Sequence, residues 1–258
     1  MKEFFGFGGY NREAEGFLSW QHLLFVGSLL AVMTSLAIFL GKKYRNKTLG
    51  EQNKVLIGAA LLIDGLEIIK IVLLCARDAG FGPILRNLPL FLCSIQLLAL
   101  PIAAFTKGRV KEAATDFVCL FGILGAVFGT IGAGQNYNAY PVLSLDNVVS
   151  GLTHCISGFA SLYVMIAGMA GLKRKNIGIT FAILMIFCVA AYIANVLIPY
   201  NYMFLMAGDG TPYDILYNLV GGSKILYPAA VVGLFLLYIA LFYYVKSLIA
   251  RKKQAAVS

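Results

Sequence analysis

Long apolar blocks separated by short polar segments dominate this chain. The blocks run for roughly 18 residues or more with few charges, a length typical of helices that span a membrane. Seven blocks can be placed, at approximately residues 21–41, 54–75, 88–105, 114–134, 149–171, 177–199 and 225–248. The pattern therefore predicts an all-α, polytopic membrane protein, with a single seven-transmembrane-helix bundle over residues 1–258.

Basic residues concentrate in alternate polar segments. Fifteen lysines and arginines follow the first, third, fifth and seventh blocks, whereas five lie on the opposite side. Because cytoplasmic loops carry the excess of lysine and arginine, we expect the N-terminus outside and the C-terminus in the cytoplasm. The same loops account for the net charge of +9, since they would lie against an anionic leaflet. Nucleic-acid binding is therefore not expected.

Composition limits what else the chain can hold. Hydrophobic residues make up 60% of the 258 residues and charged residues 13%, far from the usual balance of a soluble protein. The spans use most of the chain, so any active site must lie between helices or on short loops. The N-terminal residues lack a basic n-region, and we expect the first block to be retained as a helix.

Cysteine is the residue type of this chain with the widest range of possible chemistry. The five cysteines show no C-x-x-C spacing, so the sequence predicts no metal site, disulfide framework or cofactor. Cys93 stands apart because it lies in Leu88-Pro89-Leu90-Phe91-Leu92-Cys93-Ser94, three residues before Gln96. Gln96 would share its helix face and could donate a hydrogen bond to an oxyanion. Buried cysteine is nevertheless common as a packing residue.

A histidine is expected at the same depth. Span five enters from the outer side, and His154 would lie about as far into the membrane as Cys93. It follows Ser150 and precedes Ser157 and Ser161 at helical spacing, a pattern that also lets helices pack closely. His154 is thus either a packing hydrogen bonder or a general base.

Charged residues within the second span form the other polar group. Asp64, Glu67 and Lys70 follow an i, i+3, i+6 spacing and share one helix stripe. Glu67 and Lys70 can neutralise each other and lock helix packing, or the three can line a site. The spare carboxylate could orient an imidazole. Four further polar residues are expected near the outer rim: His22, Asn195, Asn201 and Tyr202.

Three features together resemble one family. The Leu-Pro-Leu-Phe-Leu-Cys-Ser string at residues 88–94, the later His154, and the Asn-Tyr-Met-Phe-Leu string at residues 201–205 resemble the YwaF-like bacterial membrane proteins. These are similar to eukaryotic transmembrane protein 164, regarded as a cysteine-dependent phospholipid acyltransferase. The resemblance implies that Cys93 is the nucleophile and His154 the base. The chain departs from many members at Phe91, where they have histidine.

Three functions remain open at this point. The first is a lipid acyltransferase or acyl hydrolase that acts on phospholipids through an acyl-thioester, at the outer side of a bacterial plasma membrane. The second is a transporter or binding protein for an ion or small solute that uses Asp64, Glu67 and Lys70. The third is a non-catalytic seven-helix protein. No obligate protein partner is predicted.

Overall fold

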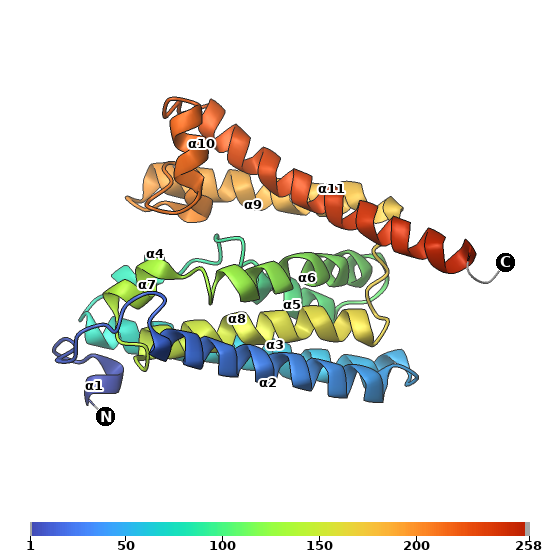
Figure 1. Ribbon diagram of the computed structural model, residues 1–258, viewed down its shortest axis with the longest axis horizontal. Coiled ribbons are helices and arrows are strands. Elements are labelled where there is room, and N and C mark those ends of the chain that lie inside the picture. Colours follow the sequence, from blue (N-terminus) through green and yellow to red (C-terminus); the bar gives the residue numbers. More distant parts are fainter. Residues whose placement is uncertain (1, 256–258) are drawn as a thin grey trace. The chain divides into compact units, whose positions relative to one another are not determined.

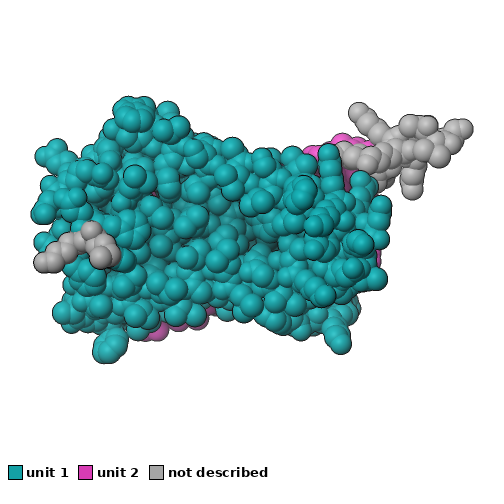
Figure 2. Space-filling model, turned by 90° about the horizontal axis from the view of Figure 1, so that it is seen from below, with its two compact units in different colours: residues 1–170 teal, residues 171–258 magenta. Residues whose placement is uncertain are grey.

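The computed structural model describes residues 2–255, and side chains for residues 3–248. All secondary structure in this part of the chain is helical. The chain divides into two compact units, residues 1–170 and 171–258 (Figure 2). Each unit is described by itself, and the single domain over residues 1–258 stays a prediction.

The first unit is built from eight helices within its described residues. In chain order they are α1 (Lys2–Phe5), α2 (Trp20–Tyr44), α3 (Leu49–Arg77), α4 (Gly82–Arg86), α5 (Gln96–Phe105), α6 (Gly108–Phe128), α7 (Gly134–Ala139) and α8 (Leu145–Ile166). Helix α8 is the central element, because it contacts α2, α3, α5, α6 and α7. Figure 1 shows α4, α7 and the N-terminal segment together at one end of this unit.

Polar residues near the other end of the first unit join its helices. Gln52 donates from Nε2 to the carbonyl oxygens of Tyr44, Arg45 and Ala167, at 3.1, 3.2 and 3.0 Å. The backbone carbonyl of Gln52 accepts a 2.8 Å hydrogen bond from the Tyr163 hydroxyl. One buried amide therefore ties α3 to the ends of α2 and α8. Buried polar groups with partners of this kind fix helix register within an otherwise apolar core.

The second unit is a smaller group of helices. It contains the 3-10 turn η1 (Arg174–Asn176), α9 (Ile177–Leu197), the 3-10 turn η2 (Tyr202–Phe204), α10 (Tyr213–Leu219) and α11 (Leu226–Ala255). Helix α9 packs against α11 and against η2, while α10 packs against α11. The long helices of both units lie close to the predicted blocks, with ends that differ by several residues.

The third block is where the helix prediction is wrong. Only Gln96–Phe105 is helical, whereas residues 88–95 form turns. Two local bonds explain the difference: the Leu90 N–H donates to the Leu88 carbonyl at 2.7 Å, and the Phe91 N–H donates to Ser94 Oγ at 2.9 Å. Serine side chains compete with the helical backbone in this way, and Pro89 cannot donate at all. Cys93 therefore lies in a turn before α5.

The fifth block begins earlier than predicted. Ser144 caps α8 by accepting a 3.2 Å hydrogen bond from the Asn147 N–H, so the helix starts at Leu145 instead of near residue 149. His154 consequently lies nine residues along α8, or about 14 Å at the rise of an α-helix. The histidine therefore lies further along its helix than a start near residue 149 would place it.

Four helices in the described part of the chain are long and apolar enough to cross a membrane. They are Trp20–Tyr44, Leu145–Ile166, Arg174–Leu197 and Leu226–Leu248. Helix α5 is too short, with ten residues, and α3 and α6 carry several charged side chains. An integral membrane protein follows from these apolar helices. The count of seven spans and the orientation of the termini stay predictions.

Candidate active site

Cys93 lies in a single helical turn that leads into α5. The turn is closed by the Ile95 N–H, which donates to the Phe91 carbonyl at 3.0 Å, and by the Ser94 hydroxyl, which donates to the same carbonyl at 3.1 Å. The backbone N–H groups of Cys93 and Ser94 precede the first hydrogen bonds of this turn, which are made by the Ile95 and Gln96 N–H groups. The thiol is therefore held at the start of a helix, where N–H groups are left without helical acceptors.

His154 is held by the helix that carries it. Its Nδ1 lies 2.7 Å from the carbonyl oxygen of Ser150, with the Ser150 hydroxyl 3.4 Å away. Because a carbonyl oxygen can only accept, Nδ1 carries the proton and donates it. In a neutral imidazole, Nε2 is then left as the acceptor. The ring is thus fixed in the tautomer that a general base requires.

The thiol and the imidazole meet. Cys93 and His154 face each other closely enough for a hydrogen bond between their side chains. Both are partly exposed, unlike Cys119, Cys155 and Cys188, which are buried. A thiol beside an unprotonated imidazole nitrogen is the arrangement that nucleophilic catalysis by cysteine requires.

Two glycines, one in α6 and one directly after it, make this approach possible. A Cβ atom placed on Gly125 would lie 3.1 Å from the Cβ of Cys93. A Cβ placed on Gly129 would lie 1.9 Å from Cδ2 and 2.1 Å from Nε2 of His154, which is far inside van der Waals contact. The ring of His154 therefore occupies the volume that any other residue at position 129 would fill.

Gln96 adds a polar group with no partner. Its side chain is fully buried, at 0% exposure, and neither Nε2 nor Oε1 has a hydrogen-bond partner. Nearly all buried polar atoms in proteins are paired. The amide therefore requires an explanation beyond packing.

The charged stripe of α3 forms an ion pair. Lys70 Nζ lies 2.6 Å from Glu67 Oε1, which confirms that these two side chains neutralise each other. Lys70 also acts electrostatically on His154, so the pair lies near the imidazole. Asp64 Oδ1 is buried and has no partner. The expectation that a spare carboxylate orients the imidazole is wrong for His154, because the Ser150 carbonyl does so.

His22 is a structural histidine. Its Nδ1 accepts a 3.1 Å hydrogen bond from the Leu18 N–H, and its Nε2 lies 3.3 Å from the Thr130 carbonyl. The ring packs on Tyr137, with centroids 3.9 Å apart. Both nitrogens are used, so His22 joins the start of α2 to the segment after α6 and has no free base to offer.

Three of the predicted site residues organise a loop of the second unit. Asn195 donates from Nδ2 to the Tyr202 carbonyl at 3.0 Å and accepts from the Tyr202 N–H at 2.6 Å. Asn201 donates to the Ala207 carbonyl at 2.8 Å and accepts from the Met206 N–H at 2.9 Å. Met203 is held at a φ of 55°, which is rare for a residue other than glycine. The side chains of Asn195 and Asn201 are therefore hydrogen bonded to nearby backbone groups.

Comparison with known proteins places the chain in a family. A family model described as the TMEM164 family matches residues 17–246. The chain belongs to the TMEM164 family. No curated protein and no solved structure matches it. The resemblance to transmembrane protein 164 is thereby confirmed, while the YwaF-like bacterial label stays a prediction. The matched range includes Cys93, Gln96 and His154.

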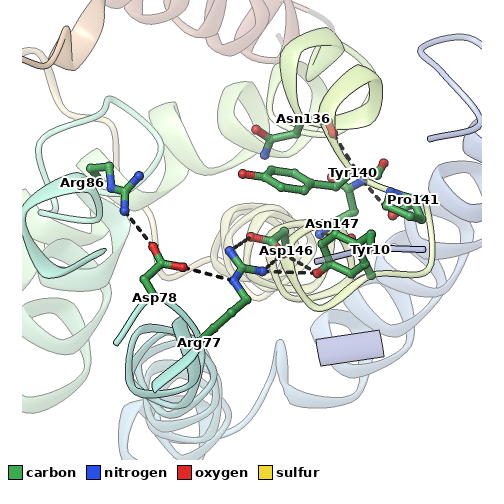
Figure 3. Close-up of polar contacts among 10 residues, drawn as sticks. Tyr10, Arg77, Asp78, Arg86, Asn136, Tyr140, Pro141, Asp146 and Asn147 are labelled. Atoms are coloured by element: carbon green, nitrogen blue, oxygen red, sulfur yellow. Dashed lines mark hydrogen bonds and ion pairs between the residues drawn. The ribbon is translucent and has the colours of Figure 1, made fainter. Parts of the chain in front are cut away.

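One polar network was missed by the sequence reasoning (Figure 3). Arg77, which ends α3, binds Asp146 in the first turn of α8 through two contacts, Nη1–Oδ2 at 2.7 Å and Nη2–Oδ1 at 3.2 Å. The Tyr10 hydroxyl donates to Asp146 Oδ2 at 2.6 Å. Arg77 also contacts Asp78, which pairs with Arg86. The network fastens the N-terminal segment onto the ends of α3 and α8.

Burial and the hydrogen bond to Asp146 raise the pKa of Tyr10. An acidic residue in a first helical turn is a sequence signal for helix stabilisation, but no spacing indicates a partner as distant as Arg77.

Among the described residues, no group of three or more His, Cys, Asp or Glu side chains could hold a metal ion.

Proposed function

We propose that the protein is a lipid acyltransferase or acyl hydrolase in which Cys93 is the nucleophile and His154 the general base. The supporting observation is the interaction of the Cys93 thiol with the His154 side chain, whose Nδ1 is tied to the Ser150 carbonyl, which leaves Nε2 as the nitrogen that can accept the thiol proton. A base oriented by a third group is the usual arrangement around an activated thiol. The resemblance to transmembrane protein 164 supports the same chemistry.

The reaction proceeds in two balanced steps. His154 Nε2 takes the thiol proton, the Cys93 sulfur bonds to the ester carbonyl carbon, and the carbonyl electron pair moves to oxygen. When the pair returns, the carbon–oxygen ester bond breaks, and the leaving alkoxide takes the proton from the imidazolium. A lysolipid hydroxyl or water then attacks the acyl-thioester in the same manner, and the Cys93 thiol is released.

The surroundings of Cys93 support a substrate that enters from lipid. Non-helical backbone at membrane depth is tolerated where protein buries it or where it lines a cavity, and within the non-helical residues 88–95 Cys93 lies against Gly125 of α6. His154 is about 14 Å along α8. A phospholipid would therefore have to bring its ester into the bundle. We assign this site to the outer half of a seven-span protein of the bacterial plasma membrane.

Acyl exchange in reconstituted vesicles tests the proposal. Purified protein is mixed with phospholipid and a labelled lysophospholipid, and transfer is followed by mass spectrometry. We expect Cys93→Ala and His154→Gln to abolish exchange. Cys75→Ala is the matched control, since this partly exposed cysteine lies on α3 and has no predicted catalytic role. Full exchange by Cys93→Ala would disprove the proposal.

A second function is supported by the unpartnered carboxylate of Asp64. Its buried Oδ1, with the Glu67–Lys70 ion pair on the same helix stripe, could bind a cation or a small polar solute. Solute flux that survives Cys93→Ala but is lost in Glu67→Gln would favour transport. Flux that is absent from wild-type vesicles would reject it.

A further inference from the structure

The buried side chain of Gln96 lowers the stability of the fold. The side chain is 0% exposed, and both of its polar atoms lack partners. Each buried polar group left unpaired carries the full cost of its desolvation, so an apolar side chain of the same size would be more stable at this position. A residue that destabilises its own site is typical of a functional position.

The backbone places this amide on the side of the thiol. The Gln96 N–H donates to the Cys93 carbonyl at 3.3 Å, an i to i+3 hydrogen bond. In such a turn, side chains three residues apart lie one above the other. Helical side chains also lean toward the N-terminus of their helix. We therefore expect the Gln96 side chain to extend back toward the turn that carries Cys93.

We propose that Gln96 is the side-chain donor of an oxyanion hole, which it forms with the backbone N–H groups of Cys93 and Ser94. This assignment rests on the proposed function and names the part of it that stabilises the tetrahedral intermediate. The two N–H groups lie at the start of the turn, before the Ile95 and Gln96 N–H groups that make its first hydrogen bonds, where helix geometry leaves N–H groups without acceptors. When the sulfur bonds to a carbonyl carbon, the oxygen bound to that carbon lies within the same set of donors.

The unpaired state of the amide follows from this role. The donors of an oxyanion hole must be in place before the charge develops on the oxygen. A donor that first has to break a hydrogen bond to another group stabilises the oxyanion less. Gln96 Nε2 has no partner to leave. Loss of one oxyanion donor lowers the rate of acyl transfer by about 10²–10³-fold in enzymes that use one.

Two probes of Cys93 separate oxyanion stabilisation from thiol reactivity. p-Nitrophenyl butyrate acylates the thiol through a tetrahedral oxyanion, whereas iodoacetamide alkylates it by displacement at a saturated carbon and forms no oxyanion. Both adducts are located on Cys93 by peptide mass spectrometry of the full-length protein in detergent. The variant is Gln96→Met, which keeps the side-chain volume, and Gln96→Leu repeats the test should the first variant not fold.

We expect Gln96→Met to lower the acylation rate about 10²–10³-fold while the alkylation rate stays that of the wild type. The melting temperature should stay the same or rise, since the change removes two unpaired buried atoms. A merely structural role would not change the ratio of the two rates.

Three results would overturn the assignment. They are acylation of Gln96→Met at the wild-type rate, a parallel fall of both rates, and an ester probe that does not acylate wild-type Cys93. Failure of the proposed function is recognised separately, because lipid exchange in vesicles would then persist in Cys93→Ala. The ratio of the two probe rates would still decide the role of Gln96 in that case.

Discussion

Gly129→Ala is the substitution that most sharply tests the geometry of the candidate site. The backbone at Gly129 has φ −80° and ψ −8°, a region that alanine commonly occupies, but an added Cβ would also lie 2.6 Å from the Gly125 carbonyl oxygen, so the end of α6 must shift as well. The added Cβ would lie 1.9 Å from Cδ2 of His154, whereas carbon atoms in contact are about 3.5–4.0 Å apart. The imidazole must therefore retreat by roughly 1.6 Å or more.

Such a displacement breaks the orientation of the base. The 2.7 Å hydrogen bond from Nδ1 to the Ser150 carbonyl leaves little room for the ring to move. A misplacement of about 1 Å can lower a catalysed rate by roughly 10²-fold. We expect Gly129→Ala to reduce acyl exchange in vesicles by at least about that factor, with a loss of folding free energy of about 1–3 kcal/mol from overpacking.

A graded series of glycine variants supplies the control. A Cβ on Gly58, in α3, meets no atom within 4 Å, while one on Gly125 lies 3.1 Å from the Cys93 Cβ. Gly58→Ala should leave exchange unchanged and stabilise the helix by up to about 1 kcal/mol. Gly125→Ala should give an intermediate loss. A Gly129→Ala protein that exchanges acyl chains at the wild-type rate would refute the reasoning.

Further predictions concern the fold around the site. The raised pKa of Tyr10 means that its stabilising effect is complete below the unfolded pKa of about 10 and is lost as pH rises above it; the alkaline loss in thermal unfolding should be smaller in Tyr10→Phe than in the wild type, and not absent, since burial raises the pKa of Tyr137 as well. Asn195→Ala should cost about 1–3 kcal/mol, because it removes the two hydrogen bonds that Asn195 makes to the backbone N–H and carbonyl of Tyr202; an unchanged melting temperature would contradict that role. Thr48→Ala removes a capping box and should cost about 1 kcal/mol, and adding Glu51→Ala should cost little more if the two residues act together.

The helices themselves were largely predictable from the apolar blocks. The turn at residues 88–95 was not, because an apolar run does not distinguish a helix from a buried turn. The contact that decides the turn runs from the Phe91 N–H to Ser94 Oγ. In it a serine side chain competes with the helical backbone for hydrogen bonds, and the hydropathy of the sequence does not reveal this. For the same reason, the depth of His154 depended on where Ser144 caps α8.

The meeting of Cys93 and His154 was a hypothesis from depth and family resemblance, since spacing does not give the order of helices in a bundle. The sequence did contain one unused signal. Gly125 and Gly129 form a Gly-x-x-x-Gly pattern, which indicates close approach between membrane helices. Because neither glycine carries a Cβ, the side chains of Cys93 and His154 can occupy the space beside them.

The two histidines illustrate the limit of reading function from residue type. Both lie within apolar helices, and the sequence placed both near one level. Only the contacts separate them: the nitrogens of His22 are both hydrogen bonded, whereas His154 has its Nδ1 bound to the Ser150 carbonyl and its side chain beside a thiol. Availability of Nε2, which depends on the fold, is what makes one histidine a candidate base.

Direct detection of the acyl-enzyme tests the central claim best. Wild-type protein in phospholipid vesicles is quenched in acid during exchange, digested, and searched by mass spectrometry for a fatty acyl group on the peptide that contains Cys93. We predict a hydroxylamine-sensitive thioester on Cys93 that is absent from His154→Gln. Steady acyl exchange without any acyl group on Cys93 would contradict the account.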